Sequence, residues 1–376
     1  MKLQVLQKNL ARVLSITSRF ASTKAQLPIL TNLLFQAQKN KLIISATNLE
    51  TSISLGLGAR IKEEGSITIP SQTIASLVSN LNPGQIDLES KKEKLKISSN
   101  GFKSTLSGIN PADFPTVSNT IGKNALQIQT GAFLNGLSKV LFAVSTDETR
   151  PVLTGVLIII KKDVLVLVAT DGFRLSQKKI KLKGNIKNLG GKNIIIPKNT
   201  LAELLRIKGD SEVIDFSYKK DESQVVFGIA DAILSSRIIE GEFPDFERII
   251  PKKSSIKVNV DKEDFLQAVK LASVFAKDSA NVVKIAVKKD VIVVSAESKL
   301  AGSQEKKVDA KVLVGDSGGK KKLTIAFNYR FLIDFLNSVE SADVGMEFSE
   351  PNAPALFIDS KDNDFLHIIM PVKLQD

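Results

Sequence analysis

The segment ATDGFRLS at 169–176 is where residue types come closest to an active site, because it holds Asp171, Gly172 and Arg174 together. It offers no nucleophile with a base partner, which covalent catalysis requires. The simpler interpretation is a turn at the end of a strand, with Arg174 paired locally. An enzyme that uses Asp171 and Arg174 stays open as an alternative, but the residues favour a binding or structural role.

The remaining sequence is also poor in catalytic groups. The single histidine, His367, lies in an alternating strand pattern and is predicted to be a partly buried strand residue rather than a base. Walker, GxGxxG, HExxH and GxSxG motifs are absent. Because the chain has no cysteine, disulfides, thiolate metal sites and a cysteine nucleophile are excluded. We therefore expect no enzymatic activity, no cofactor and no metal site.

Basic side chains at helical spacing are the clearest sign of binding. Within 7–20, Lys8, Arg12 and Arg19 share one face with Ser15, while Leu10 lies on the opposite side. These faces hold almost no aromatic side chains, so they suit sequence-independent contact with duplex phosphates rather than base stacking. Ordinary solvent-exposed helix faces are the alternative. Similar polar faces are predicted around Lys198, Arg206, Lys270 and Lys277.

The net charge of +12 is distributed unevenly along the chain. Lys+Arg exceed Asp+Glu by 8 in residues 1–123 and by 5 in residues 124–253, and fall short by 1 in residues 254–376. A basic excess suggests a polyanionic partner, with nucleic acid first. A lysine-rich surface that keeps the protein soluble is the alternative.

The basic and polar side chains named above must be positioned by a structural unit that the chain repeats three times. A strand–turn–strand pattern occurs at 33–48, 156–171 and 284–298, with Asn40, Asp163 and Asp290 at its turn. The turns are 123 and 127 residues apart, which is the size of a domain. Amphipathic segments precede and follow the hairpins at 7–20, 69–81, 131–145, 196–207, 262–276 and 325–339.

Each repeat is predicted to run β-α-β-β-β-α-β-β. This order indicates an α+β fold in which an antiparallel sheet carries two helices on one face. The predicted domains are 1–123, 124–253 and 254–376, and a hydrophobic content of 43% lets each bury its own core. The sequence has neither an apolar run of about 20 residues nor the core of a signal peptide. We expect a cytoplasmic protein.

Six motifs occur in order along the chain: LPIL (27–30), NLE (48–50), DETRPVLTGV (147–156), ATDGFRLS (169–176), EGEFPDFERIIP (240–251) and IIMPVKL (368–374). Together they resemble the bacterial beta sliding clamp family, the processivity subunit of DNA polymerase III. The resemblance implies three DNA-clamp domains per chain, with two chains closed head-to-tail into a ring. Helices would line the hole around double-stranded DNA, and the sheets would lie outside. The partners implied are the replicative polymerase, the clamp loader and other proteins with a clamp-binding peptide, and no membrane.

The resemblance also implies roles for individual positions. Arg174 is expected to orient a bound peptide through hydrogen bonds. DNA-facing positions are Lys24, Arg150, Lys198 and Arg206. The ring interface joins Leu106 of one chain to Val274 and Phe275 of the other. The partner-peptide pocket lies between the second and third copies, at Leu153, Thr170, Gly172, Phe173, Arg174, Leu175, Pro244, Arg248, Ile249, Asn328, Phe331, Ile368, Ile369, Met370, Pro371, Val372, Lys373 and Leu374.

Three features depart from the family pattern. Gln375 and Asp376 extend the chain beyond the usual terminal leucine, beside the predicted pocket. Ser104 occupies an interface position where some relatives have a large apolar residue. Many bacterial clamps are acidic, whereas this chain is basic.

A monomeric nucleic-acid-binding protein built from the same repeats is the alternative function, and the oligomeric state distinguishes it from a ring.

Overall fold

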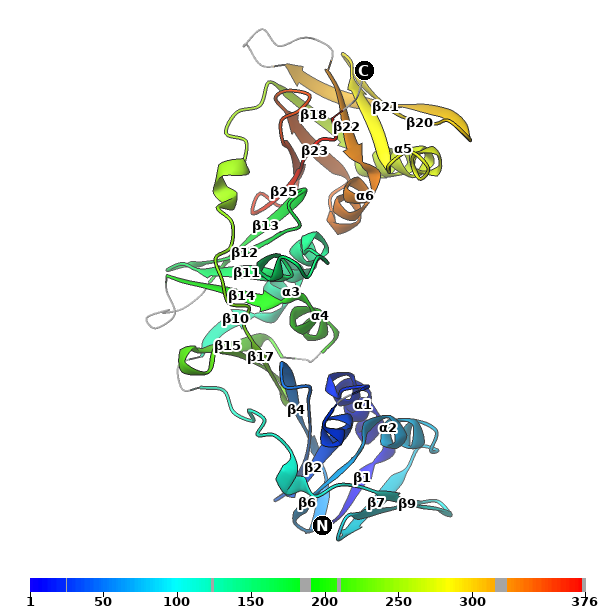
Figure 1. Cartoon of the computed structure of the whole chain (residues 1–376), viewed down its shortest axis with the longest axis vertical. Coiled ribbons are helices and arrows are strands. Elements are labelled where there is room, and N and C mark those ends of the chain that lie inside the picture. The colour runs from blue at the N-terminus through cyan, green and yellow to red at the C-terminus, as the bar shows by residue number, and fades with distance from the viewer. Residues whose placement is uncertain (25, 123–124, 183–190, 208–210, 315–322, 374–376) are drawn as a thin grey trace. The chain divides into compact units, whose positions relative to one another are not determined.

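The computed structural model describes the chain except for residues 25, 123–124, 183–190, 208–210, 315–322 and 374–376. The described residues form two compact units. The first contains Met1–Gly131 and Ala202–Ile238, and the second contains Ala132–Leu182, Gly190–Leu201 and Ile239–Asp376. Antiparallel strands and adjacent helices build both units (Figure 1).

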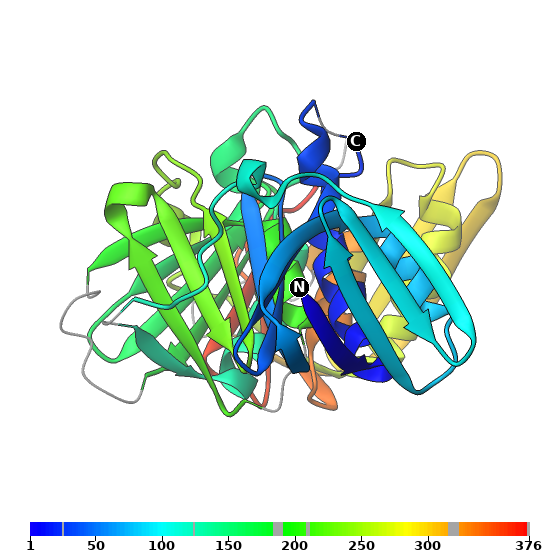
Figure 2. The same ribbon diagram turned by 90° about the horizontal axis from the view of Figure 1, so that it is seen from below.

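The first unit holds two antiparallel sheets. Figure 2 shows the five-stranded sheet with its cyan strands β8 and β9 toward the viewer. In the order in which its strands pair, this sheet contains β5 (Arg60–Glu63), β1 (Lys2–Leu6), β7 (Gln85–Lys91), β8 (Lys94–Ser99) and β9 (Phe102–Ser107). The eight-stranded sheet contains β10 (Leu126–Gln129), β15 (Val213–Lys219), β16 (Gln224–Ile229), β17 (Ala232–Arg237), β4 (Thr51–Gly58), β3 (Lys41–Thr47), β2 (Asn32–Gln38) and β6 (Gly65–Pro70).

Two helices cover these sheets side by side, α1 (Gln7–Thr17) and α2 (Ser71–Ser79). Helix α1 packs on β1, β3 and β4. Its residues Leu10, Val13 and Leu14 are buried, because their spacing places them on one side of the helix. The opposite side of α1 is left for polar residues.

The second unit is organised around a single run of twelve paired strands. Helices α5 (Lys262–Ala276) and α6 (Tyr329–Ser338) pack on each other over an aromatic core that includes Phe265, Phe327 and Phe335. The helices of the second copy are α3 (Thr130–Val140), which lies almost entirely in this unit, and α4 (Lys198–Arg206), which begins in this unit and continues into the first at Ala202. In order of pairing, the strands are β14 (Lys192–Pro197), β11 (Gly155–Ile160), β12 (Val164–Thr170), β13 (Arg174–Lys181), β25 (Phe365–Ile369), β24 (Ala355–Asp359), β23 (Asp343–Phe348), β18 (Ile256–Asp261), β21 (Gly302–Val314), β20 (Val291–Ser298), β19 (Val282–Val287) and β22 (Leu323–Asn328).

The α+β class and the threefold repeat are confirmed, but the predicted element order omits strands. The second copy runs β10-α3-β11-β12-β13-β14-α4-β15-β16-β17, and the third repeats this order from β18 to β25. The prediction lacks one strand before the second helix in the second and third copies, two in the first copy, where β5 is added, and one strand at the end of each copy. Strands β6, β14 and β22 run directly into α2, α4 and α6 without a turn, so the sequence pattern merged them with the helices. The helix predicted at 325–339 therefore begins only at Tyr329.

Strand pairing joins consecutive copies within each unit. In the first unit β17 of the second copy pairs with β4 of the first copy. In the second unit β25 of the third copy pairs with β13 of the second, through the register Arg174 to Ile369. The copies are thus connected by backbone hydrogen bonds between strands, which fix their relation locally. The ATDGFRLS segment lies at the start of one such junction.

Candidate functional site

The segment Thr170–Arg174 is a tight turn between β12 and β13, held by its own side chains. The Thr170 hydroxyl donates to the carbonyl of Arg174 at 2.6 Å. One carboxylate oxygen of Asp171 accepts from the backbone N–H groups of Phe173 and Arg174, both at 2.9 Å. Gly172 has φ of 91°, a conformation that glycine adopts without strain. The turn leaves Phe173 61% exposed.

Arg174 is engaged inside the chain by all three of its nitrogens. Its Nε donates to Asp171 at 3.0 Å, as the local-turn interpretation predicts. Its Nη1 donates to Asp334 at 2.6 Å, and its Nη2 donates to the carbonyl of Phe142 at 2.6 Å. The guanidinium lies 4.5 Å from the ring centre of Phe331, and the side chain is only 10% exposed.

The C-terminal tail follows β25 and runs past this turn. Ile368 and Ile369 are buried at the end of β25. The Met370 N–H donates to the carbonyl of Phe173 at 2.8 Å, and the Val372 N–H donates to the carbonyl of Ala326 at 2.8 Å. These two bonds hold the tail between the turn and β22. The predicted pocket residue Leu374, with Gln375 and Asp376, lies outside the described residues.

We call the exposed and half-buried side chains at this junction the tail patch, which consists of Phe173, Phe331, Met370, Pro371 and Val372. The buried residues Leu175 and Ile368 belong to one apolar cluster with Phe246, so the segment after β17 packs on the same core. The structure therefore brings together the turn, the tail, α6 and the segment around Phe246.

The other predicted pocket residues are more scattered. Leu153 is buried in a short 3-10 helix. Asn328 caps α6, since its side chain accepts from the backbone of Arg330 at 3.0 Å. Ile249 is 38% exposed, and Pro244 and Lys373 are exposed. The Arg248 side chain is 84% exposed and pairs with Asp245 at 2.6 Å.

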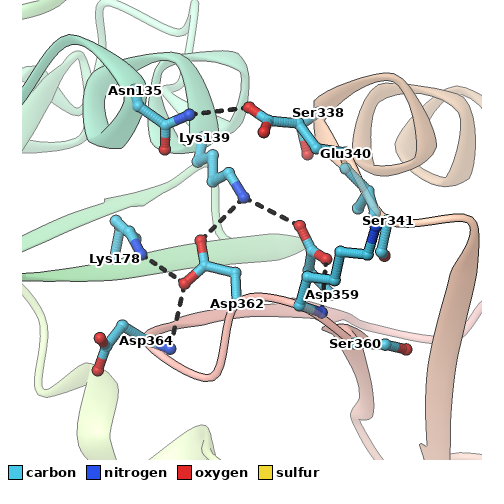
Figure 3. Close-up of polar contacts among 12 residues, drawn as sticks. Asn135, Lys139, Lys178, Ser338, Glu340, Ser341, Asp359, Ser360, Asp362 and Asp364 are labelled. Atoms are coloured by element: carbon cyan, nitrogen blue, oxygen red, sulfur yellow. Dashed lines mark hydrogen bonds and ion pairs between the residues drawn. The ribbon is translucent and has the colours of Figure 1, made fainter. Parts of the chain in front are cut away.

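A buried ionic network lies before β25, at the end of this strand opposite to the tail, and is shown in Figure 3. Lys139 on α3 donates to Asp359 at 2.9 Å and to Asp362 at 2.8 Å, and Lys178 also pairs with Asp362. The Lys139 side chain is 4% exposed. A further hydrogen bond runs from Asn135 on α3 to Glu340 at 2.9 Å. No local pattern predicts this network, because Lys139 and Asp359 are 220 residues apart.

The network sets the ionisation of its members. Burial opposes the charge of Lys139, but hydrogen bonds to Asp362 and Asp359 outweigh it and raise the pKa of the ammonium. Burial likewise opposes the charges of Asp359 and Asp362, but their contacts with Lys139 lower the pKa of both carboxyl groups. All three groups are therefore charged near neutral pH, and the network ties α3 and β13 to the turn that precedes β25.

His367 is a core residue. It is completely buried in β25, more deeply than the sequence predicts, and its Nδ1 lies 2.7 Å from the hydroxyl of Ser176. Its ring stacks on Phe335 with centroids 5.4 Å apart. Burial, assisted by the positive charge of Arg174, lowers the pKa of His367 to about 3. The imidazole is therefore neutral at physiological pH and packed away from solvent.

The predicted DNA-facing side chains lie on exposed surface, with one exception. Lys8 and Arg12 project from α1 opposite its buried residues. Arg19 follows α1 in a 3-10 helix and pairs with Glu203 at 2.7 Å, and Arg206 pairs with the same carboxylate. One acid thus partly neutralises two of the predicted contacts. Lys24, Arg150, Lys270 and Lys277 are exposed, and Lys198 is half-buried.

The predicted interface residues lie on two different kinds of surface. Leu106 is half-buried on β9, the edge strand of the five-stranded sheet. On α5, Val274 is 59% exposed and Leu271 is 45% exposed, one turn apart. Phe275 is half-buried and packs against the core of the second unit. An unpaired strand edge and an apolar helix stripe are therefore both present.

No helix in the described part of the chain is long and apolar enough to cross a membrane. No group of three or more His, Cys, Asp or Glu residues that could hold a metal ion occurs among those residues.

Three copies of one α+β domain, joined through paired edge strands and carrying lysines and arginines on their helices, are the architecture of a DNA clamp. Family models of the DNA polymerase III beta subunit match in succession: the N-terminal domain at residues 1–118, the central domain at 127–245 and the C-terminal domain at 247–373. The chain belongs to this family of sliding clamps. Its function is that of the processivity factor of DNA polymerase III in DNA replication, a subunit without catalytic activity.

Known relatives match along the whole chain. The beta sliding clamp of Staphylococcus aureus is 30% identical over 371 residues, which cover 96% of each chain. The crystal structure of the DNA polymerase sliding clamp from Bacillus subtilis is 26% identical with a TM-score of 0.93. That of the DNA polymerase III beta subunit from Thermotoga maritima is 25% identical with a TM-score of 0.90. Both structures cover 100% of this chain and are themselves covered completely. The alternative of an enzyme that uses Asp171 and Arg174 is thereby wrong.

Proposed function

We propose that two copies of this chain close head-to-tail into a ring around double-stranded DNA. The observation that carries the proposal is the pair of unlike, unpartnered surfaces, the free edge of β9 with Leu106 and the exposed stripe of Leu271 and Val274 on α5. A strand edge has unused N–H and C=O groups, and exposed apolar residues favour burial. Two different surfaces that join each other form a heterologous contact, which closes when the rotation allows it.

Duplex DNA is the ligand that we propose for the helix faces. Four basic side chains are exposed on or beside α1 and α5: Lys8, Arg12, Lys270 and Lys277. None of them has an aromatic residue directly before or after it in the sequence. Side chains of this kind neutralise phosphates without reading bases.

The domains that we propose to carry these side chains are 1–123, 124–253 and 254–376, and the compartment that we propose is the cytoplasm. Fractionation of cells and analysis of proteolytic fragments test these last two assignments.

The mass of the protein in solution tests the dimer. At micromolar concentration the wild type should sediment as a dimer, about twice the chain mass of 40.9 kDa. Val274→Asp should shift it toward monomer, because a charge would be buried in the contact. Val274 is a better probe than Phe275, which also packs on the core. Leu49→Asp, at an exposed turn residue of the first unit, is the matched control and should stay dimeric. A monomeric wild type would rule out the ring.

We propose that the tail patch binds an extended peptide segment of the replicative polymerase, the clamp loader and other partners. Its support is the exposed Phe173 beside the anchored tail residues Met370 and Val372. Apolar side chains that are desolvated in such contacts supply most of the binding energy, typically about 2 kcal/mol or more for the main anchors. A peptide with a glutamine and a Leu-Phe pair is the segment expected for this family.

A peptide titration followed by fluorescence anisotropy tests this site. Deletion of residues 370–376 removes the Met370 and Val372 backbone bonds and should abolish binding, while the solution mass stays that of a dimer. Removal of Gln375 and Asp376 alone should leave affinity unchanged or higher. Unchanged affinity after the longer deletion would place the peptide elsewhere.

A further inference from the structure

An acidic side chain, Asp334, pairs with Arg174 beside the tail patch. The family resemblance implies that Arg174 is the polar contact for a partner peptide. Its Nε, Nη1 and Nη2 are already used by Asp171, Asp334 and the carbonyl of Phe142. These bonds use three of the five N–H groups of the guanidinium, and the side chain is only 10% exposed, so most of its charge is directed into the chain.

The solvent-facing member of this group is Asp334. Its side chain is 41% exposed, four times the fraction of Arg174. Its Oδ2 accepts from Arg174, and none of the hydrogen bonds in the described part of the chain ends on its Oδ1. Both oxygens of Asp171 are used by the turn and by Arg174. One guanidinium therefore balances two carboxylates, and the excess negative charge lies on the exposed one.

Asp334 is placed to act on a peptide at the tail patch. It lies one helical turn after Phe331 on α6, and the ring of Phe331 underlies the guanidinium that Asp334 holds. The same guanidinium holds Asp171 of the turn, and the Phe173 carbonyl of this turn accepts from the Met370 N–H. A segment that covers the apolar residues of the patch would therefore pass beside this carboxylate.

We propose that Asp334 selects partner segments that place a lysine or arginine next to their apolar anchors, and that it disfavours acidic residues there. This inference rests on the proposed peptide-binding role of the tail patch. A cation beside the Oδ1 of Asp334 gains a partly exposed ion pair, whereas a carboxylate meets a like charge in the same place. The preference is local, because the chain as a whole carries a net charge of +12, which would by itself attract acidic partners.

Three labelled peptides test the proposal on the full-length protein. They share the glutamine and Leu-Phe anchors and differ at one flanking residue, which is lysine, glutamine or glutamate. Wild type should bind them in that order, with about two- to fivefold between lysine and glutamine at low salt. Asp334→Asn keeps a carbonyl for Arg174, and it should bring the three affinities together. The differences in wild type should also shrink as salt is raised.

Asp290→Asn is the matched control, since it removes one exposed carboxylate from the β19–β20 turn. This variant should keep the wild-type order of affinities. Equal affinities of wild type for the three peptides, or an order that persists in Asp334→Asn, would overturn the role of Asp334 and leave the peptide site intact. Binding of all three peptides that survives deletion of residues 370–376 would overturn both the site and this inference.

Discussion

Replacement of Lys139 by methionine tests the buried ionic network of the second unit most sharply. Methionine keeps much of the length and packing of the side chain but removes the ammonium. Asp359, whose side chain is 1% exposed, then loses its only cationic partner among the described ion pairs, while Asp362 keeps Lys178. Removal of one partner from a buried pair typically costs about 3–5 kcal/mol of unfolding free energy. We expect a loss in this range for Lys139→Met.

Urea unfolding at pH 7 measures the loss. The chain has no tryptophan and two tyrosines, so a Tyr218→Phe background leaves Tyr329 in the core of the second unit as the fluorescent reporter. Lys257→Met is the matched control, because Lys257 pairs with Glu347 in the same unit but its side chain is 58% exposed. It should change stability by about 1 kcal/mol or less. A cost for Lys139→Met no larger than that of the control would refute the role of the network.

The pH dependence of this contribution follows from the shifted pKa values. The pKa of Lys139 is raised above its ordinary 10.5, so its contribution is present below that pH and is lost as pH rises through the folded value. The pKa values of Asp359 and Asp362 are lowered from 3.8, so theirs is present above that pH and is lost as pH falls through the folded values. The contribution of these charges to the wild type should therefore be constant between about pH 5 and pH 9. In Lys139→Met the buried, unpaired Asp359 can take up a proton as pH falls, so the loss should be largest at the alkaline end of this range and shrink toward pH 5.

Two further predictions concern the single histidine and the basic helix face. His367 has a folded pKa of about 3 against an ordinary 6.5, so the unfolded chain binds its proton first. Unfolding free energy should fall by about 2 kcal/mol between pH 7 and pH 5, and His367→Asn should remove that slope in urea titrations; a slope that persists would contradict the assignment. Lys8→Ala and Arg12→Ala should weaken binding to any duplex alike and reduce the salt slope by about 0.9 per lost contact, whereas Lys289→Ala should not.

The sequence predicts those parts of the structure that depend on neighbouring residues. The three hairpins follow from Asn40, Asp163 and Asp290 between strand-forming residues, and the helices follow from their amphipathic spacing. The local pairing of Arg174 with Asp171 follows from the turn itself. By contrast, strand β14 runs into α4 without a turn residue, so no local signal separates the two.

Contacts between residues far apart in the chain set the polar character of the site, and such contacts cannot be predicted from the pattern of one sequence. Asp334 lies 160 residues from Arg174, and nothing near it on α6 indicates that it closes an ion pair with the turn. The family resemblance assigns Arg174 to the partner peptide, whereas in the structure it holds the turn and pairs with Asp334. The pairing of β13 with β25, together with the packing of Phe335 of α6 on His367 of β25, brings these groups together.

Retention on DNA of different topology tests the ring most directly. After loading onto nicked circular DNA by a clamp loader, the protein should stay bound at moderate salt and should leave when a restriction enzyme cuts the circle. A ring held by topology can slide off only at a free end, whereas surface contacts through residues such as Lys8 and Arg12 weaken with salt on any DNA. Loss on linearisation is the result that the account predicts. Equal retention on circular and linear DNA would contradict it.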